Sequence, residues 1–416
     1  MSAPEIYEQI ESDVRTYCRQ FPVEFRAARG SSLTDVDGRR YLDLMSAAGS
    51  LNYGHNHPII KAAVIDYLAG DGPVQSLDLH TEAKTEFIRT FRDTVFAPRN
   101  IDYKIQFAGP TGSNCVEAAL KIARVATGRS TVAAFTGGFH GGSLGALAVS
   151  SNRKKRSAAG VTLPGAVFLP YDGALDSLSE SLGYVEMVAT ESATGVDKPA
   201  AFILETIQGE GGVATASTAW LRGVADIAAR HDILLIVDDI QAGCGRTGSF
   251  FSFEDAGIEP DIVCLAKSVG GLGLPMALVL LKRPLDVLPR GSHAGTFRGQ
   301  NLSFVAGTAA LGLWSDREFL NGIDNVVTGL ETFSAEVGHI PGATPRGRGA
   351  LRGVHFSNGA VAGQIVQRAF EAGILLETSG ADSDVVKIMP PLTTPLDELS
   401  DALNIVLSLI KETSYV

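Results

Sequence analysis

The 416-residue sequence predicts an α/β fold built around a mostly parallel sheet. Apolar runs of strand length occupy 201–205, 233–239 and 261–267, and they are rich in Val, Ile and Leu with almost no alternation. Such runs are typical of strands that are covered on both faces. A helical pattern at 218–231 lies between the first two runs, which gives the strand–helix–strand order of a parallel sheet.

A second helix is predicted at 111–128, where a Gly-Ser turn precedes an apolar stripe at helical spacing. Gly128 is expected to end this helix. Glu117 and Lys121 are four residues apart, so we expect them to form an ion pair on the helix surface.

The C-terminal part of the chain has a different order of elements. After about residue 325, helical and strand-like runs alternate as far as a terminal helix at 396–412. We therefore expect a large domain at 50–322 and a smaller α+β domain made from both chain ends, residues 1–49 and 323–416.

Composition and charge exclude several classes of function. The formal net charge of −11 argues against nucleic acid as a partner, because phosphate backbones require a cationic surface. The one basic run, at 153–156, is expected to be a solvated loop. No stretch approaches the roughly 20 apolar residues that span a bilayer.

The N-terminal residues carry several acids and no apolar core, so they do not resemble a signal peptide, and a cytoplasmic protein is expected. The four cysteines are far apart and lack the paired spacing of metal ligands, so no metal site is predicted and reduced thiols are expected.

Several residues capable of chemistry follow the predicted strands, where ligands bind in open α/β sheets. They are Glu205, Asp238 and Lys267 at strand ends, Phe139 and His140 shortly after a strand near 131–135, and Gly112 and Ser113 at a helix start. Taken singly, each has an ordinary structural role as a loop lysine, a helix cap, a core aromatic residue or a turn.

Together these residues match the requirements of pyridoxal 5′-phosphate. An amine forms an imine with the cofactor aldehyde, and a carboxylate keeps the pyridine nitrogen protonated. An aromatic ring stacks on the pyridine, and a helix N-terminus with free N–H groups binds the phosphate. The order and spacing of the set therefore predict a pyridoxal phosphate site.

The sequence VDDIQAGCGRTGSFFSFEDAGIEPDIVCLAKSVGGLGLP, at 237–275, resembles the class III (ω-type) aminotransferases. The resemblance extends over nearly the whole chain. The further matching segments are LNYGHNHP (51–58), TGSNCVEAALKIAR (111–124), GFHGG (138–142), ETIQGEGG (205–212), GTFRGQN (295–301) and MPPLT (389–393).

The resemblance implies a fold-type I enzyme with a seven-stranded, mostly parallel sheet, in which two identical subunits build shared active sites. It also implies a role for individual residues. Lys267 would be the Schiff-base lysine, Asp238 would pair with the pyridine nitrogen, and Gln241 would contact the ring hydroxyl. Phe139 would stack on the ring beside His140, and Glu205 and Glu210 would lie near the ring and the substrate. Gly112 and Ser113 would bind the phosphate, and Thr296 would reach the phosphate of the neighbouring subunit.

Two positions depart from the family pattern and bear on the substrate. Lys387 stands where ornithine- and γ-aminobutyrate-type members carry an arginine that binds the glutamate α-carboxylate and is masked by the residue matching Glu210. Arg298 stands where a glycine is usual. Lysine offers a point charge instead of a bidentate fork. Either Lys387 and Glu210 keep a weaker version of this switch, or Arg298 binds the carboxylate instead.

The implied activity is transfer of an amino group between L-glutamate or 2-oxoglutarate and an ω-amino or aldehyde substrate. The motifs further imply that L-aspartate-β-semialdehyde becomes L-2,4-diaminobutyrate. Alternatives are transfer to another ω-amino acid or diamine, and isomerisation by an aminomutase or racemase of the same fold. A non-catalytic binding protein is disfavoured, because it would need none of Lys267, Asp238 and Gln241.

Overall fold

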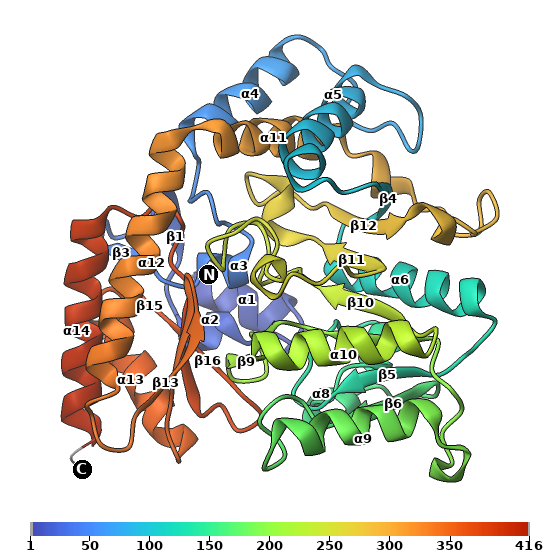
Figure 1. Cartoon of the computed structure of the whole chain (residues 1–416). Coiled ribbons are helices and arrows are strands. Elements are labelled where there is room, and N and C mark those ends of the chain that lie inside the picture. The colour runs from blue at the N-terminus through green and yellow to red at the C-terminus, as the bar shows by residue number, and fades with distance from the viewer. Residues whose placement is uncertain (1–2, 415–416) are drawn as a thin grey trace.

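The computed structural model describes residues 3–414, and the side chains of residues 6–413. Its centre is a seven-stranded sheet with the order β4-β12-β11-β10-β7-β5-β6 (Figure 1). The strands are β4 (Tyr103–Gly109), β5 (Val132–Phe135), β6 (Ala166–Leu169), β7 (Ala201–Leu204), β10 (Leu234–Asp238), β11 (Ile262–Leu265) and β12 (Ala277–Lys282). Strands β11, β10, β7, β5 and β6 pair in parallel, whereas β12 is antiparallel to both β11 and β4. The predicted mostly parallel sheet is confirmed.

Helices cover both faces of this sheet, as the unbroken apolar strands require. Along β10, Leu235 and Val237 pack into one hydrophobic cluster with Trp220 of α10 (Thr218–Arg230). Ile236, which points to the opposite face, packs into a second cluster with Val116 of α6 (Gly112–Thr127). The remaining helices beside the sheet are α5 (Glu82–Phe91), α7 (Leu144–Ala148), α8 (Arg153–Ser157) and α9 (Leu178–Thr190).

Helix α6 begins and ends where the sequence predicts. Thr111 is its N-cap, and the Thr111 hydroxyl accepts a hydrogen bond from the Asn114 N–H at 3.4 Å. Gly128 adopts φ +69° just past the helix, in the left-handed region that favours glycine.

The expected ion pair between Glu117 and Lys121 is wrong. The Glu117 carboxylate instead accepts hydrogen bonds from the Gly145 and Ala146 N–H groups, at 2.9 and 3.1 Å. These free N–H groups at the start of α7 are a stronger attraction than a solvated ammonium. The Lys121 ammonium donates to the Ser292 carbonyl at 3.0 Å.

Both ends of the chain meet in a second group of elements (Figure 1). One sheet has the order β1-β2-β3-β15, and β15 is parallel to β3 with Ile374 opposite Leu42. Another has the order β13-β14-β17-β16. We propose the domain boundaries given above, although α12 crosses residue 322. The elements are β1 (Phe25–Arg29), β2 (Ser32–Asp35), β3 (Arg40–Asp43), β13 (Thr344–Arg348), β14 (Leu351–His355), β15 (Ile374–Leu375), β16 (Glu377–Ser379), β17 (Val385–Ile388), α12 (Arg317–Val337), α13 (Gly359–Glu371) and α14 (Leu396–Ser414).

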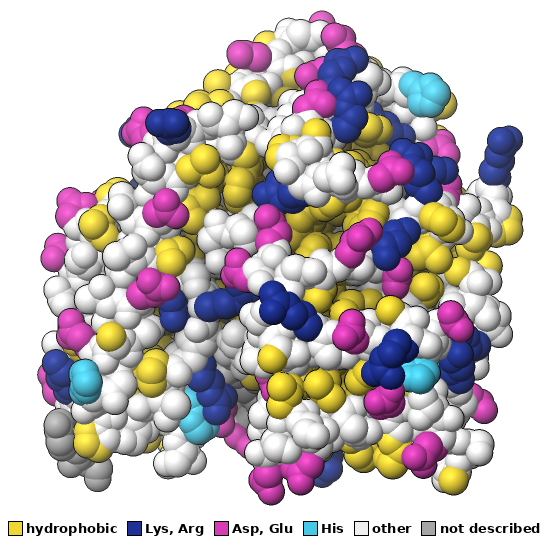
Figure 2. Space-filling model, in the orientation of Figure 1, with side chains coloured by type: hydrophobic (Ala, Val, Ile, Leu, Met, Phe, Trp, Pro, Cys, Tyr) yellow, Lys and Arg dark blue, Asp and Glu magenta, His cyan; other side chains and the backbone are white. Residues whose placement is uncertain are grey.

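The remaining helices and strands connect these parts. They are α1 (Ala3–Ile10), α2 (Tyr17–Gln20), α3 (Ser46–Gly49), α4 (Pro58–Ala69), α11 (Asn301–Gly312), β8 (Ile207–Gln208) and β9 (Ala214–Thr215). Within residues 3–414, no helix has the length and apolarity needed to cross a membrane. Acidic and basic side chains are interspersed over the face shown in Figure 2.

Candidate active site

A cavity of about 220 Å³ opens at the edge of the large sheet where the parallel strands end. Its lining residues are Thr111, Gly112, Ser113, Phe139, His140, Gly141, Gly142, Glu205, Glu210, Asp238, Ile240, Gln241 and Lys267. All of the site residues predicted from the sequence are in this set except Thr296, Arg298 and Lys387.

Lys267 lies just past the end of β11, at the start of a short 3-10 turn (Lys267–Gly270). Its backbone has φ +53°, an uncommon conformation for a residue with a side chain and one that is concentrated at functional sites. Burial lowers the pKa of the Lys267 amine, and the positive charge of Lys387 lowers it further, against the charge of Glu210.

Asp238, the last residue of β10, forms a buried pair with His140. The Asp238 Oδ2 atom is 2.7 Å from His140 Nδ1, and Asp238 Oδ1 accepts a hydrogen bond from the Ile240 N–H at 3.2 Å. Burial acts to lower the pKa of His140, but the hydrogen bond and charge of Asp238 raise it overall. The pairing therefore fixes the orientation of the Asp238 carboxylate.

Glu205 follows β7 and accepts a hydrogen bond from the Phe139 N–H at 2.8 Å. Burial raises the pKa of Glu205 to about 8, and the negative charge of Asp238 contributes in the same direction. A raised pKa favours the protonated form of this carboxyl, which can donate a hydrogen bond into the cavity.

The start of α6 forms a compact cradle on one side of the cavity. The Ser113 hydroxyl accepts a hydrogen bond from the Gly142 N–H at 3.2 Å. Gly141 has φ +133°, and a Cβ atom there would lie 2.3 Å from Ser113 Oγ. The first N–H groups of this 16-residue helix have no partner within the helix, so the cradle is suited to an anion.

Gln241 is buried beside the cavity and is only partly hydrogen-bonded. Its Nε2 group donates to the Ala48 carbonyl at 3.0 Å, but its buried Oε1 atom has no partner among the described residues. A Cβ atom on Gly209 would lie only 1.6 Å from Gln241 Oε1, so glycine is required for this close approach. The free Oε1 atom is a hydrogen-bond acceptor for a ligand in the cavity.

Lys387, on β17, does not line the cavity but is joined to it through Glu210. The buried Lys387 ammonium lies 2.7 Å from Glu210 Oε1 and 3.0 Å from Glu377 Oε1. The Tyr17 hydroxyl donates to Glu377 Oε2 at 2.9 Å. Burial opposes the charged state of each partner, but their mutual attraction raises the pKa of Lys387 and lowers that of Glu210 to about 2.

The expectation that residues 153–156 form a solvated loop is wrong, because they form the short helix α8. The Arg156 guanidinium donates to three backbone carbonyls at 2.7–2.9 Å. The Lys155 Nζ atom lies 3.8 Å from the centre of the Phe139 ring and 3.5 Å from Glu210 Oε2. A basic tetrapeptide gives no signal of these contacts, which depend on how distant segments pack together.

Glu377 and Tyr17 were also missed by reasoning from the sequence. Glu377 precedes Lys387 by ten residues, and β16 pairs with β17 so that Glu377 is directly opposite Lys387. A carboxylate and an ammonium on two short neighbouring strands are a favourable cross-strand pair, and this could have indicated the contact.

Thr296 and Arg298 lie in another part of the molecule, on the 3-10 turn Thr296–Gly299. This turn pairs with the segment around Ser76, whose N–H donates to the Gly299 carbonyl at 3.0 Å. Thr296 is exposed, and Arg298 is half-buried with Nε and Nη2 unpartnered among the described residues. Burial lowers the pKa of Arg298.

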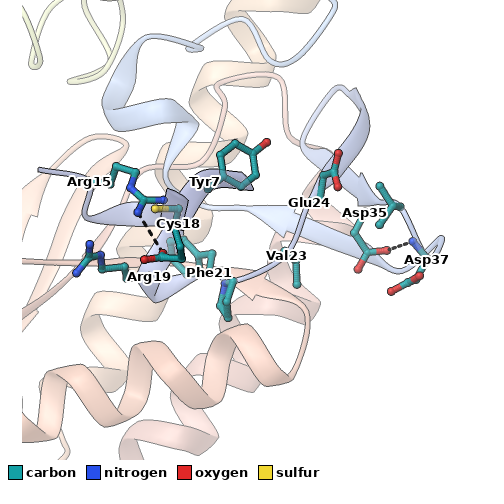
Figure 3. A pocket seen from close by; sticks show the side chains of 12 residues that line it. Tyr7, Arg15, Cys18, Arg19, Phe21, Val23, Glu24, Asp35 and Asp37 are labelled. Carbon is teal, nitrogen blue, oxygen red and sulfur yellow. Dashed lines mark hydrogen bonds and ion pairs between the residues drawn. The ribbon is translucent and has the colours of Figure 1, made fainter. Parts of the chain in front are cut away.

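A larger cavity, of about 630 Å³, lies between the N-terminal segment and β1–β2 (Figure 3). Arg15, Cys18 and Arg19 line one side of it, and Asp35 and Asp37 lie on the other. None of the residues around Lys267 lines this cavity, so the larger volume does not mark the candidate active site.

The family model for class III aminotransferases matches residues 15–410. A diaminobutyrate–2-oxoglutarate transaminase of Nocardia farcinica is 52% identical over 96% of this chain and 92% of its own. The enzyme of the same name from Halomonas elongata is 47% identical over 96% of this chain and 97% of its own.

Among solved structures, ornithine aminotransferase of Toxoplasma gondii superimposes with a TM-score of 0.85 and 25% identity, over 99% of this chain and 95% of that one. A structure of the Toxoplasma gondii enzyme carries pyridoxal phosphate at its active site. Full-length sequence similarity, the shared fold and the cavity at Lys267 agree. The chain belongs to the class III aminotransferases, and its cofactor is pyridoxal 5′-phosphate.

Proposed function

We propose that this aminotransferase moves an amino group from L-glutamate to L-aspartate-β-semialdehyde, giving 2-oxoglutarate and L-2,4-diaminobutyrate. The main observation in support of amino-group transfer is that Lys267 and the Asp238–His140 pair line the same cavity, and that the pKa of Lys267 is lowered. The choice of substrate is supported by full-length similarity to transaminases named for diaminobutyrate and 2-oxoglutarate.

The residues of the cavity fit the cofactor. Its phosphate would be held by Gly112 and Ser113 at the start of α6, where the cradle suits an anion. Phe139 would supply an aromatic face, and Gln241 Oε1 would accept a hydrogen bond that it otherwise lacks. When bound, pyridoxal phosphate supplies an electron-accepting ring to the substrate carbon.

Lys267 would bind the cofactor and move the proton. Because burial lowers the pKa of its amine, a larger fraction is neutral near physiological pH and can accept a proton at Nζ. The same amine can then return that proton. Asp238 would stabilise positive charge on the cofactor ring, and His140 Nδ1 holds the carboxylate in place. Glu205 would donate or accept a hydrogen bond at the cavity wall.

We also propose that two copies of the chain assemble and share their active sites. Leu77 and Phe297 are 49% and 62% exposed on the paired segments described above, so two large apolar side chains are available there for a partner chain to cover. Thr296 and Arg298 lie on the same segments, outside their own chain's cavity. The proposed location is the cytoplasm, which suits the four free cysteines.

The test is a titration of purified protein loaded with pyridoxal phosphate, with L-2,4-diaminobutyrate, L-glutamate, ornithine and γ-aminobutyrate added separately. Diaminobutyrate and glutamate should each remove the visible absorbance of the cofactor, and 2-oxoglutarate should restore it. A Lys267→Ala variant should show no such cycle. If ornithine or γ-aminobutyrate acts faster, the proposed substrate is wrong. Conversion of an amine without any keto acid would indicate an isomerase instead.

A further inference from the structure

The Lys387 ammonium already has two carboxylate partners. Its side chain has 0% exposure, and carboxylates contact it from two sides, Glu210 at 2.7 Å and Glu377 at 3.0 Å. The Tyr17 hydroxyl donates to the second oxygen of Glu377. A substrate carboxylate that bound Lys387 would have to enter this enclosed position, and displacing the buried Glu377 from its cation is strongly unfavourable.

Glu210 has a second oxygen, and a different cation contacts it. Lys155 Nζ lies 3.5 Å from Glu210 Oε2, and its side chain is 44% exposed, whereas Glu210 Oε1 remains with Lys387. Glu210 thus contacts two cations, the buried Lys387 and the solvent-exposed Lys155. An exposed pair at this distance is weak, so a competing carboxylate can replace it without disturbing the buried pair.

Lys155 does not line the cavity but is held beside it, in contact with two residues that do. Its N–H is capped by the Asn152 side chain at 3.0 Å, and Arg156 ties α8 to three carbonyls. Its ammonium lies over the ring of Phe139, and both Phe139 and Glu210 line the cavity that contains Lys267. The neighbouring Lys154 is exposed, and its side chain forms no hydrogen bond or ion pair with the residues that the structure describes.

We propose that Lys155 binds the carboxylate of the amino-acid substrates, with Glu210 holding the ammonium in position until a substrate replaces it. This inference rests on the proposed function only in that the substrates carry a carboxylate. It differs from both possibilities raised by the sequence, since neither Lys387 nor Arg298 is the carboxylate partner. Lys155 is a substrate-binding residue in this scheme, and the proton transfer remains with Lys267.

The experiment compares Lys155→Met with a matched Lys154→Met control, which removes the same charge from the same helix. Methionine keeps most of the apolar stem over Phe139. Each protein, loaded with pyridoxal phosphate, is reacted with L-2,4-diaminobutyrate and with 1,3-diaminopropane, which is the same diamine without the carboxylate. Lys155→Met should raise the apparent dissociation constant for diaminobutyrate about 10- to 100-fold and change that for diaminopropane less than about twofold. Lys154→Met should leave both unchanged.

Glutarate, which carries carboxylates but no amine, provides a measurement that is independent of turnover. Its binding is followed by the change in visible absorbance of the loaded protein, and Lys155→Met should weaken it about tenfold or more. Equal effects on the two diamines, or unchanged glutarate binding, would overturn the proposal. Selective loss in Arg298→Met instead would assign the carboxylate to Arg298. If the wild-type enzyme ignores diaminobutyrate, the proposed substrate fails, whereas the glutarate comparison still decides the role of Lys155.

Discussion

Replacing Lys387 with methionine should destabilise the folded protein, because the substitution removes the cation that pairs with the buried Glu377 and the partly buried Glu210. The Lys387 side chain has 0% exposure, Glu377 has 5%, and Glu210 has 28%. Removing one partner of a buried pair typically costs about 3–5 kcal/mol, since the remaining charge keeps its desolvation penalty.

The structure supports a value near the lower end of that range. The pKa of Glu210 is lowered from 4.5 to about 2 in the folded state, with Lys387 as the main favourable charge. At 1.36 kcal/mol for each pKa unit, this corresponds to about 3 kcal/mol of stability at neutral pH. For a chain of this size, we expect a decrease of roughly 3–4 °C in the unfolding temperature.

The loss should depend on pH in a defined direction. In the wild type, the lowered pKa of Glu210 gives stability that is present above pH 4.5 and is lost as pH falls towards about 2. In the variant, burial raises the pKa of Glu210 and Lys387 no longer opposes it, so the folded state favours the protonated form of that carboxyl. The penalty should therefore be smaller at pH 6.5 than at pH 8.5.

Thermal unfolding of the cofactor-loaded proteins at these two pH values tests the reasoning. Lys104→Met is the control, because Lys104 is 45% exposed and pairs with Asp286 at the surface. That variant should lose at most about 1 kcal/mol at either pH. The reasoning is refuted if Lys387→Met is no less stable than Lys104→Met at pH 8.5. Adding Glu210→Gln to Lys387→Met should recover part of the loss, because one orphaned charge is removed.

Three further predictions concern the cavity and the proposed dimer. Asp238→Asn should reduce turnover about 100-fold or more with the fold retained, and wild-type turnover in a steady-state assay would contradict its role. Gly209→Ala should weaken cofactor binding in a titration, because its Cβ atom would displace Gln241, whereas Gly183→Ala has open space and should bind normally. Phe297→Asp should yield inactive monomers by light scattering, and an active dimer would exclude this surface as the interface.

The main elements of the sheet could be predicted from the sequence because burial on both faces leaves a local signal. Strands β7, β10 and β11 are apolar up to their carboxyl ends, and a polar residue stands at or just past each of those ends, at the same edge of the sheet. Parallel pairing brings those ends together, so the grouping of Glu205, Asp238 and Lys267 follows from topology. The short strand β16 has no such signal, because all three of its residues are polar.

Only part of the charge network around Lys387 could be predicted. The family resemblance indicates the pairing of Lys387 with Glu210, which the structure shows at 2.7 Å. Tyr17, Lys155 and Glu377 are unremarkable in their local sequence, and their contacts depend on how the chain ends pack against the large sheet. For this reason the sequence predicts only a solvated loop for the basic run that contains Lys155. Local charge density indicates solvation on average but carries no information on a specific distant partner.

The presence of Glu377 explains why a lysine, Lys387, stands where related enzymes have an arginine. The compact Lys387 ammonium donates a hydrogen bond to Glu210 Oε1 at 2.7 Å and forms an ion pair with Glu377 Oε1 at 3.0 Å, so one lysine balances the charge of two carboxylates. A planar guanidinium would present a bidentate fork to one of them and would need more space in a position with no exposure. Once Lys387 is committed to two internal carboxylates, the substrate carboxylate requires another cation. Lys155 meets this requirement, because it is accessible, contacts the cavity wall and shares Glu210 with the buried lysine.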